Sequence, residues 1–231
     1  MPNNYSHLFI LLSAGPSRRM YNFKETKYLV TIDKEPLISK QIRIIEDCYP
    51  DARIHVGLGE CHEEIKRILP KRIKITYCKD FETNNSCSTL RQILLREPNK
   101  YKLTTVICGD ILFNHEAIQN IQGDELLIVD KYTKTDDIEC NISHQNTIDY
   151  IQYGKKNANK WGQIFTFRDV NYQHILNSLA TGDKSKWFLH ELINNLIEDY
   201  FIISARWNKN SYAVDLDDYK EYRKIKKELE Q

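Results

Sequence analysis

The chain is 231 residues long, and its 33 Lys and Arg residues against 32 Asp and Glu residues give a formal net charge of +1 at pH 7. Without a strong net charge, no overall field attracts nucleic acid or an anionic membrane, so any anion site must be local. Hydrophobic residues make up 41% of the sequence and aromatic residues 11%, which excludes an intrinsically disordered chain. No stretch approaches the roughly 18 apolar residues of a membrane span, and the N-terminus lacks the basic segment of a signal peptide. We therefore expect a cytoplasmic protein.

The cysteines indicate neither a zinc site nor a disulfide framework. They are scattered without a C-x-x-C pair or a His-rich neighbour at metal-ligand spacing. Several adjoin apolar runs, where a thiol acts as a small hydrophobe. We predict that they are reduced and lie in the core; they are Cys48, Cys61, Cys78, Cys87, Cys108 and Cys140.

The first half of the sequence alternates between short apolar runs and helical periodicity. Strands are predicted at 8–12, 53–58, 73–77 and 103–108. The intervening helices follow Pro36 or end at Pro70 and Pro98. This alternation predicts an α/β fold with a doubly wound, mostly parallel sheet, which binds ligands at the carboxyl ends of its strands.

The second half reads differently. A hairpin at 138–143 and 147–153, followed by a strand at 163–167, predicts a small antiparallel insert. Helices near 169–180 and 187–198, a strand pair at 200–206 and 212–216, and a basic helix from Tyr219 complete the chain. No repeat or linker interrupts it, so we predict one domain over 1–231 with two parts that meet near residue 130.

The segment after the first strand suits a polyanion. Ser13, Ala14 and Gly15 let backbone amides approach a ligand, and Arg18 and Arg19 follow. The guanidinium of Arg19 would make bidentate contacts with a polyphosphate, and the ammonium group of Lys27 would add a point charge. A solvated basic loop is the alternative.

Two acidic positions suit a divalent cation. Asp110 follows a buried strand, where a carboxylate is either a helix cap or a ligand contact. Near the C-terminus, Asp218 with Glu221 fits a capping box, which leaves Asp217 for a cation, with Asp215 as the fallback. A site of carboxylate oxygens suits Mg²⁺ that also binds a substrate phosphate.

Short motifs in this order resemble the nucleotidyltransferases of the glycosyltransferase-A type fold. The segments 12–20, 27–29 and 35–38 are similar to that family's signature L-A-A-G-x-G-x-R-M, P-K-x-L and k-P-L-I. Gly109–Asp110 and Asp215–Asp217 resemble later landmarks. Asn84-Asn85-Ser86-Cys87-Ser88 is most similar to the phosphocholine cytidylyltransferase branch. Ser17 and Thr26 depart from the signature, which has glycine and proline there.

The resemblance implies a role for each matched residue. The part before residue 130 would bind a nucleoside triphosphate, with CTP favoured, and the part after it the acceptor. Arg19 and Lys27 would act on the leaving pyrophosphate, and Asp110 with Asp217 would hold Mg²⁺. The expected nucleotide contacts are Leu12, Ala14, Gly15, Pro16, Ser17, Arg18, Asn85, Ser88 and Gly109.

The acceptor pocket is predicted in the second half, from Tyr153, Lys155, Trp161, Gly162 and Glu191. An aromatic wall would favour a quaternary ammonium group, whereas Lys155 would favour a phosphate. The sequence does not choose between these chemistries, and Trp161 could equally be core packing.

These observations predict transfer of a nucleoside monophosphate, CMP from CTP, to a small phosphorylated acceptor such as phosphocholine or a sugar phosphate, with release of pyrophosphate. The expected partners are these small molecules, with no nucleic acid and no membrane; a homo-oligomer is left open. One alternative is a glycosyltransferase of the same fold that uses Asp215-Leu216-Asp217 as its D-x-D motif. The other is a nucleotide-binding module without turnover, suggested by Ser17 and Thr26.

Overall fold

The computed structural model describes residues 6–16, 26–97, 99–129, 138–154 and 159–216, together with Arg223 and Lys227. The helix expected from Tyr219, with its Asp218–Glu221 capping box, therefore lies almost entirely outside the described residues.

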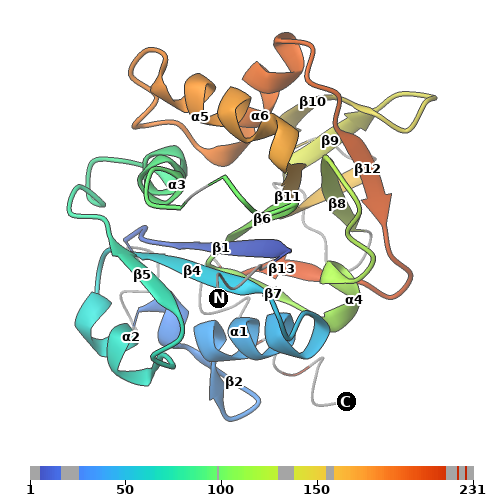
Figure 1. The fold of residues 1–231 in the computed structure, drawn as a ribbon. Helices are drawn as coiled ribbons and strands as arrows, with labels where there is room; N and C mark the ends of the chain where they lie inside the picture. Colours follow the sequence, from blue (N-terminus) through green and yellow to red (C-terminus); the bar gives the residue numbers. More distant parts are fainter. Residues whose placement is uncertain are drawn as a thin grey trace.

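One sheet of nine strands forms the middle layer (Figure 1). Its parallel half has the strand order β6-β1-β4-β5, with β1 in the middle. Each of these strands lies where an apolar run predicts it, because strands buried on both faces need few polar side chains. Their bounds are β1 His7–Ser13, β4 Arg53–Leu58, β5 Lys74–Tyr77 and β6 Leu103–Cys108.

The antiparallel strands predicted for 138–167 are present and continue this sheet. The strand β11 runs antiparallel to β6, β8 and β9, and β9 pairs with β10. The order β10-β9-β11-β6 thus joins the second part of the chain to the first. The strands are β8 Glu125–Val129, β9 Ile138–Ile142, β10 Ile148–Tyr153, β11 Asn159–Arg168 and β12 Ser204–Trp207.

Helices cover both faces of the sheet (Figure 1). Side chains of β1 alternate between the faces: Leu8 and Ile10 pack in the core below α3, α5 and α6, whereas Phe9 and Leu11 pack in the core of α1 and α2. The helices are α1 Leu37–Cys48, α2 His62–Ile68, α3 Ser86–Leu94, α4 His115–Ile118, α5 Tyr172–Ala180 and α6 Leu189–Glu198, with 3-10 turns η2 Lys27–Leu29 and η3 Asp169–Asn171.

The pair expected between the strands at 200–206 and 212–216 is wrong. The strand β12 instead runs parallel to β8, and β13 (Ala213–Asp215) pairs antiparallel with β7 (Ile111–Phe113) in a separate ribbon. A further short ribbon joins β2 (Thr31–Ile32) to β3 (Glu35–Pro36). Pairing partners depend on contacts far apart in sequence, which strand propensity does not specify.

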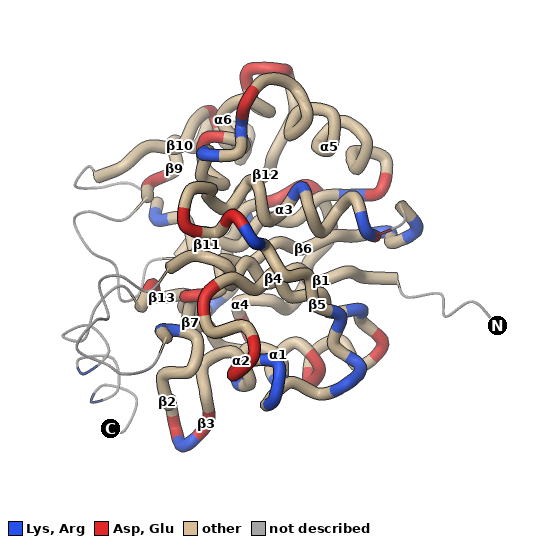
Figure 2. The backbone as a smooth tube through the Cα atoms, turned by 90° about the vertical axis from the view of Figure 1, so that its left-hand side faces the viewer, with Lys and Arg blue, Asp and Glu red and all other residues tan. Residues whose placement is uncertain are grey.

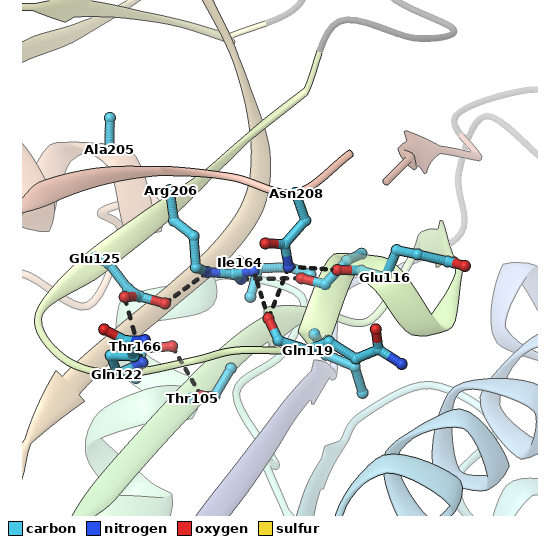
Figure 3. A network of polar contacts seen from close by, with 12 residues as sticks. Thr105, Glu116, Gln119, Gln122, Glu125, Ile164, Thr166, Ala205, Arg206 and Asn208 are labelled. Carbon is cyan, nitrogen blue, oxygen red and sulfur yellow. Dashed lines mark hydrogen bonds and ion pairs between the residues drawn. The ribbon is translucent and has the colours of Figure 1, made fainter. Parts of the chain in front are cut away.

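A buried arginine connects β12 to the segment around α4 (Figure 3). Arg206 forms an ion pair with Glu125, with 2.5 Å between Nε and Oε1, and donates to the carbonyl oxygens of Ala117 and Gln119 at 2.9 and 3.2 Å. The Asn208 side chain donates to Gln119 O as well, at 2.7 Å. These bonds satisfy carbonyls at the end of a four-residue helix, which has too few turns to satisfy its own.

The structure confirms the predicted α/β fold class, a Rossmann-like sheet flanked by helices. Basic and acidic residues are interspersed along the described chain (Figure 2). All six cysteines are free thiols, as predicted. Cys78, Cys87 and Cys140 are buried, whereas Cys48, Cys61 and Cys108 are only partly buried, so the predicted core position is confirmed for three of the six. Among the described residues, no helix has the length and apolar character of a membrane span.

Candidate active site

The backbone after β1 enters a pocket at the carboxyl end of the parallel strands. Leu12, Ala14, Gly15 and Pro16 line it, as expected for a loop that approaches a ligand. The hydroxyl of Tyr28, which is buried, donates to Gly15 O at 3.0 Å. This bond fixes the beginning of the loop on η2.

A tight turn presents Asp110 to the same pocket. Gly109 donates its backbone N–H to Leu12 O at 3.0 Å, so the turn lies directly on β1. A Cβ at residue 109 would lie 2.2 Å from Ser13 Oγ and 2.8 Å from Leu12 O, which leaves room only for glycine. From α1, the buried Gln41 donates to the carbonyl oxygens of Gly109 and Ile111, at 3.1 and 2.7 Å. The backbone on both sides of Asp110 is thereby fixed.

Asp215 reaches the pocket through the β13–β7 ribbon. Asp215 is the register partner of Ile111, and the Leu216 N–H donates to Asp110 O at 3.0 Å. Two carboxylates that are distant in sequence therefore stand on adjacent backbones. The structure brings Asp110 together with the fallback residue Asp215, while Asp217 lies outside the described residues.

Lys27 completes a charged cluster with these two carboxylates. Its Nζ forms an ion pair with Asp110 Oδ2, and its side chain is 14% exposed. Burial alone would lower the pKa of Lys27, but the charges of Asp110 and Asp215 and the hydrogen bond to Asp110 outweigh burial and raise it. Lys27 is therefore a fixed cation at any physiological pH. The pKa of the neighbouring Cys108 thiol is raised by burial and by Asp110, so this thiol stays neutral.

The pocket has a volume of about 540 Å³, which fits a ligand of nucleotide size. The β1 loop lines it together with the beginning of α3, through Asn84, Asn85, Ser86 and Thr89. Residues of β9, β10 and β11 and the beginning of α6 also line it. The beginnings of α3 and α6 are adjacent, because the Cys87 N–H donates to Trp187 O at 3.1 Å. Lys27, Asp110 and Asp215 line the same pocket.

Two expected nucleoside contacts differ in their surroundings. Asn85 lines the pocket, and its amide donates to Lys186 O at 2.5 Å, which connects α3 to the segment before α6. Ser88 is not among the lining residues; its hydroxyl accepts a hydrogen bond from Asn84 at 3.3 Å. Gly109 likewise lies behind the lining, where it shapes the turn.

The acceptor candidates divide in a similar way. Tyr153, Trp161 and Gly162 line the pocket. The Trp161 side chain is only 4% exposed, so it also packs in the core, and its indole N–H donates to Ile164 O at 3.1 Å. Glu191 does not line it, because its carboxylate accepts the Phe188 backbone N–H at 2.7 Å and caps α6. Contact of Glu191 with an acceptor stays a prediction, and its contact in the structure is with the beginning of α6.

Two further aromatic residues beside Tyr153 at the rim of the pocket, Phe188 and His190, were missed from the sequence. His190 stacks on Phe188 with ring centroids 5.9 Å apart and meets Tyr153 edge-on at 4.9 Å. Phe188 and Tyr153 are 48% and 59% exposed, which is unusual for large rings. Phe188 and His190 lie at the beginning of α6, 35 residues or more from Tyr153, and no local pattern connects them.

Two glutamines were also missed. Gln41 occupies a position in the apolar stripe of α1 between Ile38 and Ile45, and a polar residue there is a detectable signal. Gln163 lines the pocket and donates from Nε2 to Asp215 Oδ2 at 3.0 Å. Its sequence neighbours predict only a strand.

Several predicted residues lie outside the described residues. They are Ser17, Arg18, Arg19, Lys155 and Asp217. Their roles remain predictions. Among the described residues, Lys27 and Lys160 bring positive charge to the pocket, and Lys160 forms an ion pair with Glu139 at 2.6 Å.

The donor set of the site fits a hard divalent cation. Asp110 and Asp215 provide carboxylate oxygens at adjacent positions, next to space for a ligand that could supply further oxygens. Within the described ranges, no group of three or more His, Cys, Asp or Glu side chains is placed to hold a metal ion. Two carboxylates with open positions are typical of Mg²⁺ shared with substrate phosphates.

Comparison with solved structures gives the class of this fold. The CTP:phosphocholine cytidylyltransferase from Streptococcus pneumoniae matches with a TM-score of 0.82 at 15% identity, over 97% of this chain and 99% of that one. The inositol-1-phosphate CTP transferase from T. maritima matches with 0.77 at 13% identity, over 97% and 94%. The nucleoside-diphosphate-sugar pyrophosphorylase from Vibrio cholerae RC9 matches with 0.75 at 13% identity, over 95% and 99%.

No protein-family model matches the sequence, and no curated protein matches it. The solved structures are nucleotidyltransferases by name, as the sequence resemblance predicted, and the chain has their fold over nearly its whole length. At these identities the similarity establishes the fold, and the chemistry must be argued from the site.

Proposed function

We propose that this chain is a nucleotidyltransferase that transfers CMP from CTP to a small phosphorylated acceptor and releases pyrophosphate. One observation carries the proposal: Lys27, Asp110 and Asp215 converge in a pocket between a loop suited to phosphates and a wall of aromatic side chains. A nucleotide and an acceptor could meet there on either side of the charged cluster.

The residues provide binding and charge rather than covalent chemistry. The β1 loop would hold the triphosphate through its backbone, and Lys27 would offset negative charge on the leaving pyrophosphate. Asp110 and Asp215 would hold Mg²⁺, which supplies charge neutralisation at the phosphates when bound. An oxygen of the acceptor phosphate would then attack the α-phosphorus as the bond to pyrophosphate breaks.

The aromatic rim supports phosphocholine among the acceptors. Tyr153 and Phe188 are exposed aromatic side chains, and aromatic rings attract a quaternary ammonium group. Burial lowers the pKa of His190, so its ring is neutral at pH 7 and does not repel a cation. The same rings tolerate a sugar, which stacks on aromatic faces without needing a charge.

Pyrophosphate release is the direct test. The protein is incubated with Mg²⁺, each of the four ribonucleoside triphosphates, and phosphocholine or a sugar 1-phosphate. We expect pyrophosphate with CTP and phosphocholine. The variant Asp110→Asn keeps a hydrogen-bond acceptor for Lys27 but removes the negative charge, and we expect it to react roughly 10²- to 10³-fold more slowly. Free nucleoside diphosphate from a sugar nucleotide would instead identify a glycosyltransferase, and no product from any triphosphate would overturn the proposal.

The acceptor is tested with a neutral isostere. Replacing phosphocholine by 3,3-dimethylbutyl phosphate keeps the shape and removes the positive charge. A cation-π contribution of about 1 kcal/mol would raise KM about fivefold for the isostere, with KM for CTP unchanged. Equal KM values for the two acceptors would contradict recognition of the ammonium group.

A further inference from the structure

The strand β11 brings a neutral amide to one of the two carboxylates. Gln163 Nε2 donates to Asp215 Oδ2 at 3.0 Å across the gap between β11 and β13. Gly162 allows this approach, because a Cβ there would lie 2.9 Å from Leu127 Cδ2 and 3.1 Å from Ala213 Cβ. The contact thus depends on close packing of β11 against the ribbon that contains Asp215.

The backbone at Gln163 is in the left-handed region, with φ of 54°. Long side chains rarely adopt this conformation, which glycine or asparagine accepts more readily. The register of β11 with β8 shifts between Trp161 and Phe165, so Gln163 lies in an irregular part of the strand. Such irregularities redirect a side chain, here toward the pocket.

The chemistry of the donor matters as much as its position. Lys27 already supplies one positive charge against Asp110 and Asp215. A second cation at residue 163 would cancel the remaining negative charge, whereas a carboxamide orients Asp215 and leaves its charge intact. A carboxylate held in this way keeps its attraction for a divalent cation.

We propose that Gln163 is a positioning residue that orients the Asp215 carboxylate for a divalent cation. This inference rests on the proposed function for its biological purpose, but it concerns metal binding and can be measured without turnover. Outer-shell hydrogen bonds of this kind typically change metal affinity by about 10- to 100-fold.

The variant Gln163→Gly separates the amide from the backbone. Glycine relieves the left-handed conformation and removes the hydrogen bond, so a purely conformational role predicts unchanged or improved behaviour. A positioning role predicts that Gln163→Gly binds Mn²⁺ about tenfold more weakly, while its melting temperature is unchanged or higher. Mn²⁺ binding is measured by electron paramagnetic resonance, with and without α,β-methylene-CTP. Asn120→Gly is the matched control, since Asn120 is exposed and also left-handed, with φ of 58°.

A double-mutant cycle shows whether Gln163 acts through Asp215. In an Asp215→Asn background, Gln163→Gly should have no further effect on Mn²⁺ affinity. Equal Mn²⁺ affinity of wild type and Gln163→Gly, in a protein that releases pyrophosphate, overturns the inference alone. Weaker Mn²⁺ binding in Gln163→Gly, in a protein that turns over no triphosphate, supports the inference and overturns the proposed function. Absence of Mn²⁺ binding to the wild type overturns both.

Discussion

At the scale of single residues, the site depends on a cation between two anions. Lys27 forms an ion pair with Asp110 and also interacts electrostatically with Asp215. The lysine is therefore oriented before any ligand binds. Preorganised charge of this kind loses little free energy to reorganisation when a polyphosphate binds. The Leu29 N–H donates to Thr26 O at 2.9 Å, and this bond closes the turn that contains Lys27.

The contribution of Lys27 to nucleotide binding is tested by Lys27→Met. Methionine keeps the length of the side chain and removes its charge. Losing a charged hydrogen bond weakens binding by about 1.5 to 3 kcal/mol, so we expect the dissociation constant of CTP with Mg²⁺, measured by calorimetry, to rise at least tenfold. Because the pKa of Lys27 is raised, the difference should be the same at pH 6 and pH 9. Lys71→Met, at an exposed turn, is the control, and an unchanged dissociation constant for Lys27→Met would remove Lys27 from the binding site.

At the scale of elements, the turn after β6 connects the sheet to the site. Gly109 touches β1, Gln41 holds both sides of the turn from α1, and Leu216 of the ribbon binds Asp110 O. Three separate elements therefore determine where one carboxylate lies. A change in any of them should displace Asp110 without touching it.

Gly109→Ala tests this dependence. The added Cβ would meet Leu12 O and Ser13 Cα, both at 2.8 Å, and backbone atoms of a central strand can only move together. We expect the free energy of unfolding, from urea titration, to fall by about 1 to 3 kcal/mol, with weaker Mn²⁺ binding in the folded fraction. Gly123→Ala is the matched control, since nothing lies within 4 Å of its added Cβ. Equal stability of the two variants would show that the turn is free to move.

Sequence periodicity predicts the elements of this fold better than their pairing. Apolar runs mark β4 and β6 to the residue, because burial on both faces leaves a continuous signal. The ribbon that places Asp215 beside Asp110 joins strands about 100 residues apart, and nothing in either strand specifies the other. The sequence therefore proposes acidic residues for a metal, and long-range pairing determines which of them meet.

The same limit applies to the rest of the site. Motif spacing points to Gly15, Lys27 and Asp110, since each follows or faces the end of a parallel strand. Gln163 has no such signal, because its role arises from an irregular turn of β11 against β13.

At the scale of the whole molecule, a line of polar contacts crosses the middle of the sheet. His7 of β1 bonds Thr105 of β6, which bonds Thr166 of β11, each at 2.8 Å. His7 also stacks on Phe9, with ring centroids 4.2 Å apart, and is 3% exposed. The line joins the parallel half of the sheet to the antiparallel half, and it requires a neutral imidazole in an apolar setting.

Acid should therefore weaken the whole fold through His7. Burial lowers the pKa of His7 from 6.5 to about 3. Between these two pH values the imidazole is protonated in the unfolded chain and neutral in the folded chain. The resulting stability is fully present above pH 6.5 and is lost as the pH falls toward 3, by about 1.4 kcal/mol for each unit. The variant His7→Gln keeps a polar partner for Thr105 but does not titrate. Its free energy of unfolding, from urea titration, should therefore fall less steeply between pH 6 and pH 4 than that of the wild type. The control His144→Gln, at an exposed position, should keep the wild-type dependence on pH. Identical slopes in the wild type and His7→Gln would mean that His7 is protonated in the folded sheet, with other groups responsible for the acid sensitivity.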